Sequence, residues 1–95
     1  MKISDVLEKG WNNRNSNRKT SNNSFSYNAE EDKFYSYNTE IAYIDRFMET
    51  LFIYGLTAGY NNFYSTTTSS HFRKLINFCI DKKISFQIIP QENIL

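Results

Sequence analysis

The segment of this chain that comes nearest to catalytic chemistry is a run of hydroxyl side chains that ends in its only histidine. Residues 64–71 read Tyr-Ser-Thr-Thr-Thr-Ser-Ser-His. A hydroxyl beside an imidazole can act as a nucleophile that a general base activates. Such a pair also needs a third group to orient the imidazole, and a sharp glycine-framed turn commonly presents the serine. Because the sequence places neither near His71, we expect this segment to cap and pack a helix rather than to catalyse a reaction.

The same hydroxyls are typical of the beginning of a helix. Short hydroxyl side chains compete for backbone donors inside a helix, but they satisfy the free N–H groups of its first turn. The positive end of the helix dipole disfavours a protonated imidazole, so we expect His71 to be neutral. Free N–H groups at a helix start also bind phosphate or carboxylate. Two hypotheses stay open: the hydroxyls cap their own backbone, or they bind an anion. The candidate ligands are Ser65, Thr67, Thr68, Ser69 and His71.

Other chemistries find no support in the residue types. Cys79 lies eight residues beyond His71, and about 12 Å of helix rise separates them, too far for a direct dyad. One histidine and one cysteine cannot close a zinc site. Glu30, Glu31 and Asp32 are consecutive in a predicted turn and read as a solvated tip. Glycine-rich phosphate loops are absent. We therefore expect a protein that is not an enzyme and holds no metal and no cofactor.

The N-terminal part of the chain offers binding chemistry instead. Residues 12–23 are almost purely polar and carry three basic side chains and no acid, which predicts a mobile polar, basic loop. Aromatic side chains beside it could add stacking to phosphate contacts. Alternating tyrosines are equally what a sheet needs to cover its core, and a net charge of +1 lacks the basic excess of a nucleic-acid-binding domain. The candidate binding residues here are Trp11, Arg14, Arg18, Lys19, Tyr35, Tyr37 and Tyr43.

Two helices are expected to position these residues. The main helix follows the hydroxyl run over 72–83, because apolar side chains recur there at spacings of three and four. Its apolar stripe consists of Phe72, Leu75, Ile76, Cys79 and Ile80. A short N-terminal helix begins at Ser4, whose hydroxyl can cap it, and ends at Gly10.

Strands are predicted where apolar and polar residues alternate. They cover residues 25–27, 33–37, 41–44, 51–54 and 84–89. The pair Asn38-Thr39 either bends or breaks the second strand, Pro90 stops the last one, and 90–95 form a loose tail. A chain of 95 residues has room for one domain. The sequence therefore predicts a single α+β domain over 1–95, with a small antiparallel sheet of three to four strands, one main helix packed on a face and a short N-terminal helix.

One pair of motifs carries a resemblance to a known family. Tyr64-Ser65-x-Thr67-Thr68-Ser69-x-His71, preceded by Tyr37-Asn38-Thr39-x-Ile41-Ala42, resembles a family of small phage and mobile-element proteins of unknown function. In that family such a signature opens a helix after a short sheet. The resemblance covers roughly residues 33–80, so the polar loop and the last strand fall outside it. It implies phage or prophage origin and carries over no catalytic residues.

The resemblance also sets the leading functional hypothesis. Small phage proteins without a catalytic constellation commonly act by stoichiometric binding, which implies an inhibitor of a bacterial defence complex, similar to anti-CRISPR proteins. Its partner would be a host protein or a protein–RNA complex in the cytoplasm of the bacterial host cell, bound through rigid Tyr and Trp rings. The alternative is a small RNA- or DNA-binding regulator that uses the basic loop and the aromatic sheet face. No membrane association is expected, and an exposed sheet edge could pair two copies as a homodimer.

Overall fold

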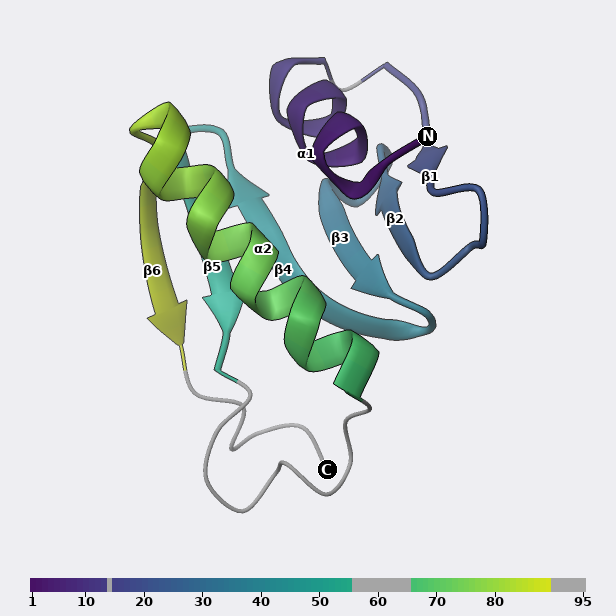
Figure 1. Cartoon of the computed structure of the whole chain (residues 1–95). Helices are drawn as coiled ribbons and strands as arrows, with labels where there is room; N and C mark the ends of the chain where they lie inside the picture. Colours follow the sequence, from purple (N-terminus) through teal and green to yellow (C-terminus); the bar gives the residue numbers. More distant parts are fainter. Residues whose placement is uncertain (14, 56–65, 90–95) are drawn as a thin grey trace.

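Two helices and six strands make up the described part of the protein (Figure 1). The computed structural model describes residues 1–13, 15–55 and 66–89, and for 66–69 the backbone alone. In chain order the elements are α1 (Ile3–Asn12), β1 (Arg18–Lys19), β2 (Phe25–Asn28), β3 (Lys33–Ser36), β4 (Thr39–Asp45), β5 (Thr50–Tyr54), α2 (Thr66–Lys82) and β6 (Ser85–Ile89). The α+β class predicted from the sequence is confirmed. The predicted tail, 90–95, lies outside the described residues.

The strands form a single sheet in the order β1-β2-β3-β4-β5-β6. The prediction of a small antiparallel sheet with three to four strands is wrong in both number and type, since the sheet has six strands and β6 runs parallel to β5. The parallel pair follows from the path of the chain. A helix separates β5 from β6, and a crossover of this kind returns the chain in the direction of the strand it left.

A tight turn at Tyr37 and the short edge strand β1 account for the higher strand count. The backbone of Asp32, Tyr37 and Glu49 has positive φ, at 62°, 56° and 52°, and each of these residues lies between two neighbouring strands. The turn at Tyr37 and Asn38 breaks the predicted second strand, so that β3 and β4 are separate strands. Within 12–23, predicted to be a loop, Arg18 and Lys19 form β1 and pair with β2.

Helix α1 differs from its prediction at both ends. Its N-cap is Lys2, not Ser4, and the side chain of Asp5 accepts a hydrogen bond from the Lys2 N–H at 3.2 Å. Gly10 does not end the helix, which continues to Asn12. A Cβ on Gly10 would lie 2.8 Å from the Tyr27 ring and 3.1 Å from the Phe34 ring. The glycine therefore lets the helix backbone approach the sheet, and this approach fixes where the C-terminal end of α1 lies.

Helix α2 begins inside the hydroxyl run, at Thr66, which confirms that the run marks a helix start, but the predicted range 72–83 began too late. Its buried face is rotated from the predicted stripe: Leu75 and Cys79 are buried as expected, but Ile80 is 60 % exposed and Phe78 only 9 %. The reason is that α2 contacts α1 as well as the sheet. A second packing partner extends the buried face toward Phe78 and leaves Ile80 in solvent.

The core lies between the sheet and the two helices, which pack against each other and against the same face of the sheet (Figure 1). Aromatic side chains from β2 and β3, Val6 and Leu7 of α1, and aliphatic residues of β4 and β5 belong to one core cluster. The largest core rings are those of Phe25, Tyr27 and Phe34. Because both described helices pack on the same face of the sheet, neither of them covers the opposite face.

Within the described residues, no helix is both long and apolar enough to cross a membrane.

Candidate binding surface

The sheet face opposite the helices carries a cluster of aromatic side chains, which we call the open face. Because neighbouring residues of a strand point to opposite sides, the residues that alternate with the core residues belong to it. They are Lys33 and Tyr35 of β3, Glu40 and Tyr43 of β4, and Phe52 and Tyr54 of β5. All six are partly exposed. Neither of the described helices covers them, so these rings are available to a partner.

Stacking and hydrogen bonds hold the open face in a fixed arrangement. The Tyr43 ring stacks on Phe52 with centroids 5.1 Å apart, and it lies 6.1 Å from Tyr54. The Tyr54 hydroxyl donates to a Glu40 oxygen at 2.7 Å, while Lys33 Nζ lies 3.0 Å from the other Glu40 oxygen. The rings are therefore ordered before any partner binds.

The charges of the open face balance one another. The Tyr35 hydroxyl donates to Glu31 at 2.6 Å, and this bond raises the pKa of Tyr35 to about 12. Burial, together with the bond to Glu40, raises the pKa of Tyr54. The hydrogen bond between Lys33 and Glu40 likewise raises the pKa of Lys33. The surface thus presents phenol hydroxyls, the Glu40 side chain and the Lys33 side chain side by side.

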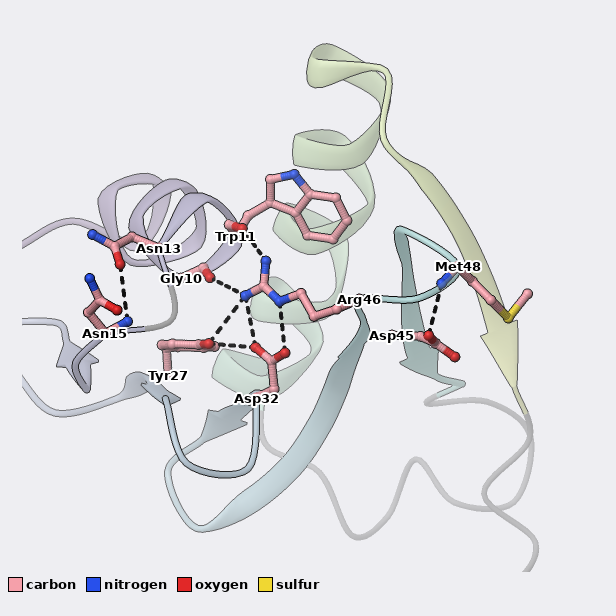
Figure 2. A network of polar contacts seen from close by, with 9 residues as sticks. All are labelled: Gly10, Trp11, Asn13, Asn15, Tyr27, Asp32, Asp45, Arg46 and Met48. Carbon is pink, nitrogen blue, oxygen red and sulfur yellow. Dashed lines mark hydrogen bonds and ion pairs between the residues drawn. The ribbon is translucent and has the colours of Figure 1, made fainter.

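On the helix side, Arg46 joins α1 to the sheet (Figure 2). Its Nε and Nη2 lie 2.8 Å and 2.9 Å from the two Asp32 carboxylate oxygens, a bidentate pair. Nη2 also donates to the Gly10 carbonyl at 2.8 Å, and Nη1 donates to the carbonyl of Trp11. The Trp11 ring lies 5.8 Å from the guanidinium carbon. Arg46 therefore satisfies two of the terminal carbonyls of α1, those of Gly10 and Trp11, which have no partners within the helix.

This Arg46 network was not predicted from the sequence, which placed Asp32 in a solvated tip. Only 7 % of the Asp32 side chain is exposed, against 36 % for Arg46. The Tyr27 hydroxyl also donates to Asp32, and burial, with this bond second, raises the pKa of Tyr27 to about 12. Residues 14 positions apart show no local pattern, so no sequence signal could have found the pair.

His71 is part of the core. It is 2 % exposed, and its Nδ1 lies 2.7 Å from the hydroxyl oxygen of Ser36, which is itself fully buried. The Phe25 ring packs 5.1 Å from the imidazole. Burial, and to a lesser extent the charge of Lys74, lowers the pKa of His71. This direction agrees with the predicted neutral form, but the prediction invoked the helix dipole and not burial. A substrate cannot reach a serine and a histidine that are both sealed from solvent, so the expected packing role fits this geometry.

The buried imidazole predicts a pH dependence of stability. The folded protein holds His71 neutral, whereas the unfolded chain protonates it below about pH 6.5. Because the unfolded state then binds more protons, the free energy of unfolding falls as the pH drops below about 6.5, with a slope of at most about 1.4 kcal/mol per pH unit. Urea unfolding between pH 5 and 7 measures this slope. His71→Asn, which keeps an acceptor near Ser36 but does not titrate, should flatten it; equal slopes in both proteins would contradict the assignment.

The predicted site residues do not gather at one place. Tyr35 and Tyr43 lie on the open face, but Tyr37 lies in the β3–β4 turn, with its ring 6.5 Å from His71. Trp11 packs on the helix side beside Arg46. Thr67, Thr68 and Ser69 belong to the first turn of α2. Arg14, Ser65 and the side chains of 66–69 lie outside what the structure describes, so the capping and anion hypotheses for the hydroxyl run stay predictions.

Arg18 and Lys19 form the edge strand β1 next to the open face. They line a shallow pocket of about 340 Å³ together with Tyr35. Its remaining wall consists of Asn17, Ser26, Tyr27 and Asn28. The Nε of Arg18 is buried and has no hydrogen-bond partner among the residues that the structure describes. Among the described residues, no cluster of three or more His, Cys, Asp or Glu side chains could hold a metal.

The fold and this surface define a small two-layer α+β domain in which a mixed sheet carries its described helices on one side. Over residues 7–92 the chain matches the Family of unknown function (DUF8033), and it belongs to that family. No curated protein and no solved structure matches the chain. The family match takes in both the polar loop and β6, which the resemblance noted from the motifs had left out.

Proposed function

We propose that this protein is a non-enzymatic binding protein and that the open face is its interface with another protein. The observation that carries the proposal is the cluster of Tyr43, Phe52 and Tyr54 on a side of the sheet that neither described helix covers. In line with the motif resemblance, we further propose a phage protein whose target is a bacterial defence complex. The family match, to a family of unknown function, supports neither the origin nor the target.

Rigid aromatic rings favour binding for a physical reason. Tyrosine and phenylalanine bury a large area at low cost in side-chain entropy, and aromatic residues dominate the energetics of most interfaces. Here the stack of Tyr43 on Phe52 and the bond from Tyr54 to Glu40 already fix the rings. A partner therefore loses little affinity to ordering this surface.

The proposal predicts that Tyr43→Ser removes binding without unfolding the protein. The tagged wild-type chain should retrieve a specific protein from bacterial host lysate, and Tyr43→Ser should retrieve at least about tenfold less, the equivalent of ~1.4 kcal/mol for one central aromatic anchor. The matched control is Tyr37→Ser, because Tyr37 is 52 % exposed but lies in the β3–β4 turn. Circular dichroism checks the fold of both variants. Equal retrieval by wild type and Tyr43→Ser would rule out the open face as the interface.

Nucleic-acid binding is a second candidate, which the pocket at Arg18, Lys19 and Tyr35 favours because Lys19 lies on the same side of the sheet as the Tyr35 ring. Against this candidate, Glu31 is bonded to Tyr35 and Glu40 to Tyr54, and both acidic side chains would repel phosphates. Fluorescence anisotropy with a labelled single-stranded RNA at two salt concentrations tests it. Several phosphate contacts require affinity to fall steeply with salt and to weaken in Lys19→Glu. If the affinity changed neither with salt nor with Lys19→Glu, nucleic-acid binding through this pocket would be excluded.

A further inference from the structure

The two edges of the sheet are protected differently. Strand β1 is two residues long and both are basic, which blunts that edge against pairing with other strands. Strand β6 is five residues long, Ser-Phe-Gln-Ile-Ile, with no charge and no proline, and it pairs with β5 without a register shift. Among the described residues, no strand pairs with the other side of β6. The β6 edge is therefore a template for another strand.

One hydrogen bond fixes which backbone groups lie at that edge. The carbonyl of Ile89 accepts from the Gly55 N–H at 2.7 Å and so points toward β5. The N–H and C=O of one residue point to the same side of a strand, and this side alternates along the chain. Ser85 and Gln87 thus face β5 as well, whereas the N–H and C=O groups of Phe86 and Ile88 point to the free edge.

We propose that β6 pairs in antiparallel fashion with β6 of a second copy of this chain, with the two-fold axis at Gln87. In this register Phe86 lies opposite the partner's Ile88, and Ile88 opposite the partner's Phe86, so every outward N–H and C=O of both residues finds a partner. It is the only antiparallel register that pairs both residues within β6. A two-fold interface of this kind is isologous and closes at two copies.

The side chains at this edge fit the same arrangement. Phe86 and Ile88 pair with Leu51 and Ile53 in register and so belong to the helix side of the sheet. Ile88 is 50 % exposed there, and the partner's Phe86 would cover it. On the other side Gln87 pairs with Phe52, so the two open faces would become one continuous surface. The dimer does not depend on the proposed function, since it rests on the edge alone.

Analytical ultracentrifugation over a range of concentrations tests the dimer. The wild-type chain should sediment at twice its mass of 11.3 kDa at high concentration and dissociate on dilution. Ile88→Pro should be monomeric, because proline removes an N–H that points to the free edge and is tolerated where no ladder bond is lost. The matched control is Lys19→Pro, an outward-facing position at the opposite edge, which should leave the dimer intact. A wild type that stays monomeric, or an Ile88→Pro protein that still dimerises, would overturn the proposal.

A disulfide test fixes the register. Gln87 faces its own copy across the axis as a non-hydrogen-bonded pair, with Cα atoms about 4.5 Å apart, within reach of a disulfide. Under mild oxidation Gln87→Cys should give a covalent dimer that reducing agent dissolves. Ser85→Cys is the control in the same strand: two such residues would lie about 13 Å apart, since each pairs with Ile89. The native Cys79 is 1 % exposed and should not react. Equal cross-linking of both variants would exclude this register.

Discussion

Arg46→Met should lower the free energy of unfolding by about 2–3 kcal/mol, because it leaves the Asp32 carboxylate buried without its counter-charge. The bidentate pair, with contacts of 2.8 Å and 2.9 Å, is lost together with the bonds to the Gly10 and Trp11 carbonyls. The value lies below that of a fully buried pair because 36 % of the Arg46 side chain is exposed. For a domain of this size the loss corresponds to a fall in Tm of about 10–20 °C, which thermal unfolding measures.

Two further variants separate the ion pair from simple loss of a side chain. Arg73→Met removes an exposed arginine on α2 and should change stability by less than about 0.5 kcal/mol. Asp32→Asn combined with Arg46→Met should be more stable than Arg46→Met alone, since the uncompensated charge is then gone. If Arg46→Met were as stable as Arg73→Met, the network in Figure 2 would contribute nothing to the fold.

Gly10→Ala should destabilise the protein by about 1–3 kcal/mol even though alanine is the better helix former by about 1 kcal/mol. The added Cβ would lie 2.8 Å and 2.9 Å from two carbons of the Tyr27 ring. That ring cannot easily move away, because it is 1 % exposed and its hydroxyl is bonded to Asp32. Steric conflict therefore outweighs helix propensity at this position.

Lys9→Ala is the matched control for Gly10→Ala. Lys9 precedes Gly10 in the same helix and is exposed, so its replacement should leave stability within about 0.5 kcal/mol of wild type. Urea unfolding of the three proteins gives the comparison. A Gly10→Ala protein at least as stable as wild type would mean that α1 does not approach the sheet as closely as described.

Gly10 and Arg46 together connect α1 to the sheet. Gly10 allows the close approach, and Arg46 then bonds the carbonyls of Gly10 and Trp11 to Asp32. Both residues act at the C-terminal end of α1, on the side of the sheet away from the open face. Damage there should reduce stability, whereas a change at Tyr43 should reduce binding. The two effects can therefore be told apart.

Local patterns in the sequence determined much of the secondary structure. Alternation located the strands over 25–27, 51–54 and 84–89, and the hydroxyl run located the beginning of α2. These signals work because they depend on a residue's immediate neighbours along the chain. The direction of β6 and the pairing of Arg18 and Lys19 with β2 depend on the path of the chain in space, which no short window contains.

The candidate surface was predictable only in part. The sequence could list Tyr35, Tyr37 and Tyr43, but it could not say which of them face the helices. The alternation of the strands put Tyr35 and Tyr43 on one side of the sheet, and the positive φ of Tyr37 put that ring elsewhere. The sequence by itself thus determined where most of the helices and strands lie and which side chains could bind. Only the tertiary structure decided that Arg46 reaches Asp32 and that the tyrosine face is open, because both depend on contacts between residues far apart in the chain.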